Sequence, residues 1–191
     1  MSFNLIKRNF IFIRHGETEG NVRSLCQGHI DFPLTELGRE QAKLSAEKIK
    51  QFLPINTLYC SDLGRAVETA KIISDKLQIK QISYYEELRE RNWGELEGQS
   101  NVKMFEQEEQ ENLGNLDSLI KGLEPKNEFL NRIQNVMNGI LNLEEQPVIV
   151  SHGRFFFTLC DLLGIAPVKQ IPNGCPILCT PIDDQWKIDI I

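Results

Sequence analysis

Three segments of the chain share one order of residues: a short apolar strand, polar residues directly after it, and then a helical pattern. They are "FIFIRHGE" (10–17), "NTLYCSDLGRAVETAKIISDKL" (56–77) and "PVIVSHGRFFFTLCDLLG" (147–164). Strands that alternate with helices are typical of parallel pairing, because a parallel pair needs a long crossover that is usually helical. We therefore expect an α/β sandwich built on a largely parallel sheet.

Local signals set the limits of these elements. Residues 58–60 and 148–150 are short apolar runs, as expected of buried strands. Ser61 or Asp62 is expected to cap the second helix, and Gly164 suits the end of the third. Apolar positions of the second helix recur at helical spacing: Leu63, Ala66, Ala70, Ile73 and Leu77.

A further helix is expected in "PLTELGREQAKLSAEKIKQFL" (33–53), with Thr35 as its N-cap. "PILCT" (176–180) and "WKIDII" (186–191) are two more strand candidates, at an edge of the sheet. The apolar stripe of the helix is expected at Leu37, Leu44, Ile49 and Phe52.

Residues 99–128 differ from the rest because they are polar and acidic, with weak periodicity. We expect one domain over residues 1–191, from which a helical excursion at about 99–128 leaves the sheet and covers the site. Its "EQEEQE" run (106–111) fits a solvated face and a wall of the site about equally well.

Composition narrows the possible partners. The net charge of −6 argues against a nucleic-acid partner, and no apolar run approaches the roughly 20 residues of a membrane span. The five cysteines are odd in number and scattered, which fits reduced thiols better than a disulfide framework. We expect a cytoplasmic protein whose oligomeric state stays open.

The polar residues that follow the three strands are the candidate functional site. Ligands of open α/β sheets bind at the carboxyl ends of parallel strands. Arg14, His15, Arg65 and His152 would meet there, and two of the chain's three histidines lie in the strand-end tripeptides "RHG" and "SHG". Four such side chains repel one another unless an anion binds between them. A phosphoryl group provides that charge and matches the arginine fork.

No metal or cofactor is expected. The sequence has no carboxylate–histidine cluster at ligand spacing and no GxxxxGK[ST] loop. Without a metal, a histidine beside a bound phosphate suggests attack on phosphorus through a phosphohistidine intermediate. The other histidine and the arginines would stabilise the charge of the phosphoryl oxygens. A proton donor is then needed for the leaving oxygen.

Five blocks of the chain resemble the histidine phosphatase superfamily, the phosphoglycerate mutase-like group, in their order and approximate spacing. They are "RHGETEGN", "QGHIDFPLTELGREQA", "SDLGRAVETA", "ELRERNWGELEG" and "SHG". The resemblance covers most of residues 10–98 and 147–180. It implies the three-layer α/β/α sandwich of that group and a small phosphorylated substrate.

The resemblance also implies roles for single residues. His15 matches the nucleophile, and the family's Leu-x-Glu motif makes Glu90 the proton donor rather than Glu86, Glu87 or Glu95. Gln27 and Gly28 match the loop that borders the substrate, although Gln27 suits a loop hydrogen bond equally well. The remaining site residues are Arg14, Asn21, Arg65 and His152 of the phosphate pocket and Gly153 of the "SHG" tripeptide.

Three functions remain open. We favour a metal-independent phosphomonoester hydrolase that acts through a phosphohistidine on a small phosphorylated metabolite. The first alternative is a phosphoglycerate mutase, but mutases of the family resemble one another in a basic, aromatic segment after the acid's loop. The corresponding segment here has one lysine and no arginine in "QSNVKMFEQEEQENLGNL". The second alternative is a non-catalytic phosphate-binding protein on the same fold.

Overall fold

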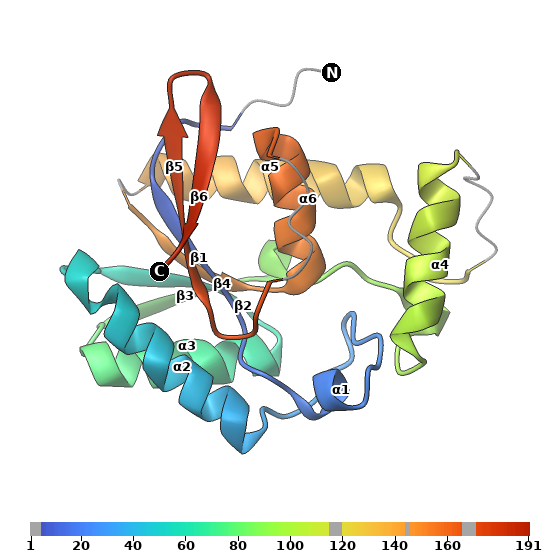
Figure 1. Cartoon of the computed structure of the whole chain (residues 1–191), viewed down its shortest axis with the longest axis horizontal. Coiled ribbons are helices and arrows are strands. Elements are labelled where there is room, and N and C mark those ends of the chain that lie inside the picture. The colour runs from blue at the N-terminus through green and yellow to red at the C-terminus, as the bar shows by residue number, and fades with distance from the viewer. Residues whose placement is uncertain (1–4, 115–119, 144–145, 166–170) are drawn as a thin grey trace.

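Six strands form one sheet in the order β3-β2-β4-β1-β5-β6 (Figure 1). The computed structural model describes residues 5–114, 120–143, 146–165 and 171–191. β1, β2, β3 and β4 are parallel, whereas β5 is antiparallel to β1 and β6 to β5. The largely parallel sheet and the strands near its edge are confirmed. The strands are β1 (Phe10–Arg14), β2 (Thr57–Ser61), β3 (Gln81–Tyr85), β4 (Val148–Ser151), β5 (Pro176–Ile182) and β6 (Gln185–Ile190).

Helices cover both faces of the sheet. α2 (Glu36–Ile49) and α3 (Gly64–Leu77) lie on one face, and α5 (Lys126–Leu143) and α6 (Gly153–Leu163) on the other (Figure 1). β1 divides its side chains between these faces, because successive residues of a strand point in opposite directions. Phe10 and Phe12 pack with residues of α5 and α6, and Ile11 and Ile13 with residues of α2 and α3.

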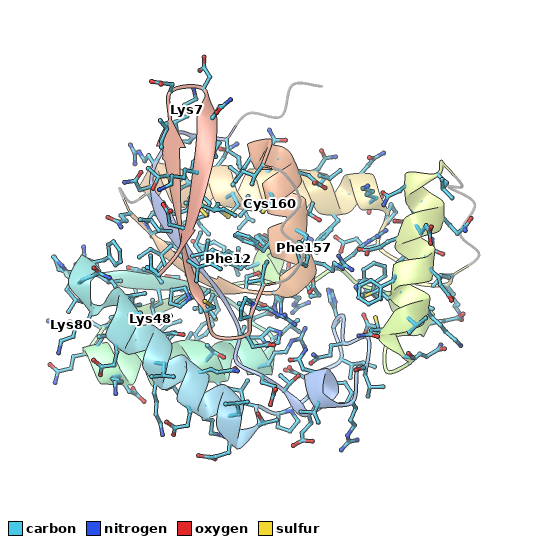
Figure 2. All side chains as sticks on the ribbon, in the orientation of Figure 1. Lys7, Phe12, Lys48, Lys80, Phe157 and Cys160 are labelled. Atoms are coloured by element: carbon cyan, nitrogen blue, oxygen red, sulfur yellow. The ribbon has the colours of Figure 1, made fainter. Side chains whose placement is uncertain are left out.

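Each face therefore has its own hydrophobic core, and all four of these β1 side chains are fully buried. Phe12 and Cys160, both labelled in Figure 2, belong to the core beneath α5 and α6. The arrangement is the expected three-layer α/β/α sandwich. No helix within the described ranges is long and apolar enough to cross a membrane.

The expected apolar stripe of α2 is partly wrong. Thr35 caps the helix as expected, since its side chain accepts a hydrogen bond from the Gly38 N–H. Leu37 and Leu44, however, are 55% and 60% exposed. The buried face instead carries mostly small residues, together with the expected Ile49, and these let α2 pack closely against α3. Its residues are Gly38, Ala42, Ser45, Ala46 and Ile49.

The expected cap of α3 is also wrong. Its N-cap residue is Leu63, which makes no side-chain capping bond. Ser61 instead lies at the end of β2, where its hydroxyl contacts His152 at 2.8 Å. Asp62 forms an ion pair with Arg89. The Ser61 hydroxyl also accepts a hydrogen bond from the Leu63 N–H at 3.3 Å, but neither side chain caps the first helical turn, which is capped from a distant loop. Gly164 ends α6 in the left-handed conformation, as expected.

Helix α4 (Asn101–Asn112) lies apart from the sandwich, at the right of Figure 1. It accounts for the first part of the expected excursion at 99–128, of which residues 115–119 lie outside the described residues. The other short elements are α1 (Glu19–Val22) and the 3₁₀ turns η1 (Lys50–Phe52), η2 (Glu86–Leu88) and η3 (Gly94–Leu96).

Candidate active site

The carboxyl ends of β1, β2 and β4 bring the four predicted phosphate-binding residues to one place. Arg14 ends β1 and His15 follows it, Arg65 lies in the first turn of α3, and His152 precedes α6. Arg14, His15 and Arg65 line one cavity of about 580 Å³. The ring of His152 lies behind them, with its centroid 5.2 Å from that of His15. Parallel pairing of these strands produces the convergence that the sequence predicted.

His15 is almost fully buried, and one ring nitrogen is already engaged. Its Nδ1 lies 2.8 Å from the Gly16 carbonyl, so this nitrogen donates and Nε2 keeps its lone pair. Burial, and then the charges of Arg65 and Arg14, lower the pKa of His15 well below its usual range. A neutral imidazole with a free Nε2 is the form that attacks an electrophile.

The backbone around His15 is tightly placed. Asn173 donates from Nδ2 to the His15 carbonyl at 3.0 Å, and the Gly16 N–H donates to Thr69 at 3.0 Å. A Cβ added to Gly16 would lie 2.3 Å from the Gly38 carbonyl oxygen. The start of α2 therefore packs directly on the loop that carries His15, and only glycine fits there.

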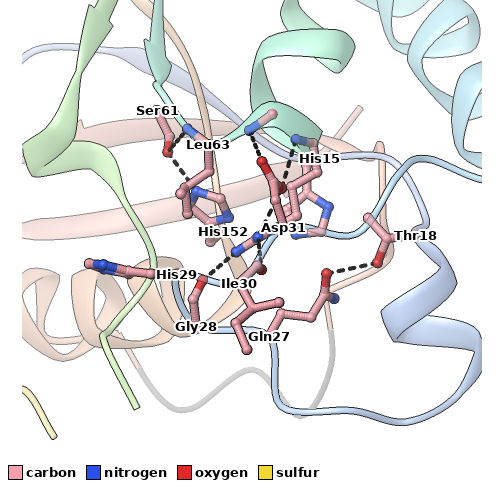
Figure 3. Close-up of polar contacts among 12 residues, drawn as sticks. His15, Thr18, Gln27, Gly28, His29, Ile30, Asp31, Ser61, Leu63 and His152 are labelled. Atoms are coloured by element: carbon pink, nitrogen blue, oxygen red, sulfur yellow. Dashed lines mark hydrogen bonds and ion pairs between the residues drawn. The ribbon is translucent and has the colours of Figure 1, made fainter. Parts of the chain in front are cut away.

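His152 is fully buried beside His15. Its Nε2 lies 2.8 Å from the Ser61 hydroxyl, as Figure 3 shows. Its Nδ1 has no hydrogen-bond partner among the described residues. Burial, followed by the charges of Arg65 and His15, lowers the pKa of His152 well below its usual range. The ring thus has one nitrogen fixed and one available for a ligand.

The two arginines are held by backbone carbonyls. Arg14 donates from Nη1 to the Ile171 carbonyl at 2.8 Å, and Arg65 donates from Nη2 to the Gly28 carbonyl at 2.7 Å. Burial lowers the pKa of both guanidinium groups. The Nε atoms of Arg14 and Arg65 are buried and have no partner in the described part of the chain. Each arginine is therefore fixed through its outer nitrogens while Nε stays available.

Asp31 is a positioning residue that the sequence reasoning missed. Its carboxylate accepts hydrogen bonds from the backbone N–H groups of Gly64 and Arg65 at the start of α3. The same carboxylate lies 3.3 Å from Nη1 of Arg65. A residue more than thirty positions upstream thus caps α3 and orients Arg65, and local capping patterns contain no signal for such a contact.

The predicted substrate-binding residues Asn21, Gln27, Gly28 and Gly153 all line the cavity. The amide oxygen of Gln27 accepts a hydrogen bond from the Thr18 hydroxyl at 2.9 Å (Figure 3). Of the two roles expected for Gln27, the loop hydrogen bond is therefore present. The residue also lies at the cavity wall. Gly28 has a φ of +52°, which favours glycine at this turn.

Glu90 also lines the cavity, whereas Glu86, Glu87 and Glu95 do not. Its carboxylate accepts hydrogen bonds from the N–H groups of Arg154 and Phe155, at 3.0 and 3.1 Å, in the first turn of α6. The predicted proton donor therefore lies at the same rim of the sheet as the histidines. The ring of His29 contacts the Glu90 carbonyl at 3.0 Å.

The outer part of the cavity is formed by α4 and by two arginines that the sequence reasoning also missed. Arg91 forms a bidentate ion pair with Glu111, with both distances 2.8 Å. Arg154 pairs with Glu108 at 2.7 Å. Two of the four glutamates of the "EQEEQE" run, Glu108 and Glu111, thus form a wall of the site, while Glu106 and Glu109 are exposed. The sequence offered one signal for these two arginines, namely their position next to predicted site residues: Arg91 follows Glu90, and Arg154 follows the "SHG" tripeptide.

Within the described ranges, no group of three or more His, Cys, Asp or Glu side chains is arranged to hold a metal ion. The residues grouped around His15 are arginines, a second histidine, Glu90 and the amide side chains of Asn21 and Gln27. Such a set of cationic and hydrogen-bonding groups is typical of a phosphoryl-binding site.

Comparison with known proteins identifies the class and then the family. The α/β/α sandwich is the fold of phosphoglycerate mutases: the crystal structure of phosphoglycerate mutase from Bacillus anthracis str. Sterne superposes with a TM-score of 0.78. That alignment covers 100% of this chain and 95% of the other, at 23% identity. The chain belongs to the histidine phosphatase superfamily (branch 1), whose sequence profile matches residues 10–189. It is accordingly an enzyme of the histidine phosphatase class.

Two relatives illustrate the range of the family. The "Probable phosphoglycerate mutase GpmB" of Proteus mirabilis (strain HI4320) is 38% identical over 147 residues, which are 74% of this chain and 67% of the relative. The "Uncharacterized phosphatase PhoE" of Bacillus subtilis (strain 168) is 28% identical over 188 residues, 92% of this chain and 90% of the relative. The chain is thus similar both to a protein named as a mutase and to one named as a phosphatase.

Proposed function

We propose that this chain is a metal-independent phosphomonoester hydrolase that acts through a phosphohistidine at His15 on a small phosphorylated metabolite. The observation that carries the proposal is a set of buried, unpartnered nitrogens on residues grouped with His15. They are Nε of Arg14, Nε of Arg65 and Nδ1 of His152, none of which has a partner among the described residues. Buried polar groups are normally paired, so such a set indicates a ligand with several acceptor oxygens. A phosphoryl group has this chemistry.

The proposed reaction has two steps. Nε2 of His15 attacks phosphorus and the bond to the ester oxygen breaks, while Glu90 gives its proton to that oxygen. Arg14, Arg65 and His152 stabilise the charge on the other phosphoryl oxygens, which replaces the role that a metal has in other phosphoryl-transfer enzymes. Water then attacks the phosphohistidine, Glu90 accepts a proton from it, and phosphate leaves.

The mutase alternative differs in the second step, where the phosphoryl group goes to a second hydroxyl instead of water. The name of the Proteus mirabilis relative favours it. The ion pairs of the outer cavity disfavour it, because Arg91 and Arg154 are each bound to a glutamate of α4. A phosphoglycerate carries a carboxylate as well as a phosphate, and it needs a cation that is free to bind that carboxylate.

A non-catalytic phosphate-binding protein is the remaining alternative. It would need the anion site but not the nucleophile or the acid. In this chain the predicted nucleophile His15 and the predicted acid Glu90 line the same cavity, which favours an enzyme.

The test is hydrolysis of p-nitrophenyl phosphate by the purified chain in the presence of a chelator, with conversion of 3-phosphoglycerate to 2-phosphoglycerate measured in parallel. We expect hydrolysis with little isomerisation. Efficient isomerisation would assign the mutase, and binding of phosphate without either reaction would assign the binding protein.

We further propose that residues 1–191 act as one cytoplasmic domain with α4 as its cap.

A further inference from the structure

The outer wall of the cavity contains an arginine held between two phenylalanines. The guanidinium carbon of Arg154, on α6, lies 4.9 Å from the ring centroid of Phe105 and 5.2 Å from that of Phe157. Phe157 projects from α6, and Phe105 from α4 (Figure 2 labels Phe157). Phe105 is 48% exposed, so a large aromatic face of α4 is available at the cavity. A large exposed aromatic side chain in a cleft indicates a contact surface for a ligand.

The positive charge of Arg154 is already compensated. Its Nη2 lies 2.7 Å from the Glu108 carboxylate, and the two side chains are only 20% and 25% exposed. Because the pair is mostly removed from water, separating it to serve another anion is costly. Arg154 is therefore held away from a substrate carboxylate by Glu108.

The second arginine of the outer cavity is held in the same way. Arg91 and Glu111 form a bidentate pair with side chains 4% and 7% exposed. The Arg91 guanidinium also lies 4.6 Å from the ring centroid of Trp93. Both arginines next to the predicted acid thus have a glutamate of α4 as their counter-ion. The organic part of a bound ester therefore contacts aromatic rings and arginines whose charge is already compensated by glutamates.

We propose that this outer cavity is a leaving-group subsite for uncharged alcohols or phenols with an apolar face, and that Glu108 excludes anionic leaving groups by occupying Arg154. The inference rests on the proposed hydrolase and names the substrate class of the same site. The substrates are then monophosphate esters whose only negative charge is the phosphate. Phosphate enters the pocket of His15, while the organic part contacts Phe105 and Phe157. A cavity of about 580 Å³ suits a small organic phosphate.

The test compares two esters that differ by one carboxylate: phenyl phosphate and 3-carboxyphenyl phosphate. A meta carboxylate changes the leaving ability of the phenol little, so a difference in kcat/KM reports binding at the outer cavity. We expect the wild-type enzyme to prefer phenyl phosphate by about tenfold or more. Glu108→Gln releases Arg154 and should reduce this preference about fivefold, mainly by raising kcat/KM for the carboxylated ester.

Glu109→Gln is the matched control, since Glu109 is the neighbouring residue of α4 and is exposed outside the cavity. It removes the same charge and should leave the preference unchanged. Glu108→Ala should act in the same direction as Glu108→Gln, which protects the test if one variant folds poorly. Phe105→Ala should raise KM for phenyl phosphate and leave ethyl phosphate, whose leaving group has no ring, nearly unaffected.

The outcomes separate the two proposals. Equal kcat/KM for the two aryl esters in the wild-type enzyme, or an unchanged preference in both Glu108 variants, would overturn the subsite and leave the hydrolase in place. Absence of hydrolysis of all three esters would overturn the proposed hydrolase and the subsite with it.

Discussion

The rings of His15 and His152 lie against each other with centroids 5.2 Å apart and planes tilted by 59°. Burial and the charges of Arg14 and Arg65 lower the pKa of both rings. The two histidines are therefore neutral in the free protein near pH 7. Nδ1 of His15 is engaged by the Gly16 carbonyl, whereas Nδ1 of His152 has no partner among the described residues. This difference assigns attack to His15 and anion binding to His152 in the proposed mechanism.

The first prediction concerns the nucleophile. His15→Ala should reduce the turnover of p-nitrophenyl phosphate by several orders of magnitude while circular dichroism stays unchanged, because the attacking nitrogen is lost. Mass spectrometry of enzyme quenched without acid should detect a phosphoryl group on His15. Near-normal activity of the variant, or an adduct at another residue, would contradict the assignment.

The second prediction concerns pH. The pKa values of His15 and His152 are lowered in the folded protein. At pH values below about 6.5, the usual pKa of histidine, the unfolded chain therefore binds more protons than the folded protein. The contribution of these histidines to stability is complete above about pH 6.5 and is lost as the pH falls toward the lowered values. The melting temperature of the free protein should therefore decrease in this window.

A bound dianion opposes the lowered pKa of His152, because its negative charge favours the protonated imidazole. Sulfate should raise the melting temperature more at about pH 5.5 than at about pH 7.5, and calorimetry in two buffers should detect proton uptake on binding. His152→Gln should reduce this pH dependence. An equal effect of sulfate at both pH values would show that the anion binds away from the histidines.

The third prediction concerns Glu90. Glu90→Gln should slow hydrolysis of ethyl phosphate by about 10²- to 10⁴-fold, since an alkoxide cannot leave without a proton. p-Nitrophenolate leaves unprotonated, so the loss on p-nitrophenyl phosphate should be much smaller when phosphoryl transfer limits the rate. Glu87→Gln is the control, because Glu87 is exposed and outside the cavity. A uniform loss on both esters would indicate a positioning role for Glu90.

The fourth prediction concerns Asp31. Asp31→Asn removes the charge that orients Arg65 and weakens the cap of α3. We expect kcat/KM to fall roughly 10- to 100-fold and the inhibition constant of inorganic phosphate to rise, because a misplaced arginine binds the phosphoryl group poorly. Asp75→Asn, an exposed position near the end of α3, should change neither quantity. An unchanged inhibition constant in Asp31→Asn would exclude the positioning role.

The fifth prediction concerns the contact between the His15 loop and α2. A Cβ added to Gly38 would lie 2.1 Å from the Glu17 carbonyl oxygen, where only backbone can move. Gly38→Ala should lower the free energy of unfolding by about 2 kcal/mol or more in urea titrations and should also reduce activity. Gly139→Ala, in α5, meets no heavy atom within 4 Å in the described residues and should stabilise by up to about 1 kcal/mol. Similar effects of both substitutions would argue against a specific clash at Gly38.

Much of the fold was predictable because its signals are local. The strand at Phe10–Arg14 is a compact apolar run that ends in charged residues, and the parallel arrangement then determines where Arg14 and His15 lie. The same reasoning placed His152 after β4. The positions of the candidate site residues at strand ends were therefore predictable from the sequence alone.

The errors concern contacts between distant segments. Leu37 and Leu44 are apolar and share a face of α2, yet the close approach of α3 selects the face with Ala42 and Ala46. Whether a glutamate of α4 faces solvent or an arginine depends on how α4 packs against α6, which periodicity does not encode. Only the structure shows Glu108 and Arg154 together.

Helix α4 reaches the cavity from outside the sheet, and its polar contacts there include ion pairs with Arg91 and Arg154. The residues proposed to carry the chemistry lie instead at the rim of the sheet, on strand ends or in the loops and first helical turn beside them. Substitutions on this helix can therefore alter which ester is accepted without disturbing the parts that all substrates use. Proteins with this arrangement can acquire new substrates through single substitutions in α4. We expect the sequences of related chains to differ most along this helix and least at the strand ends.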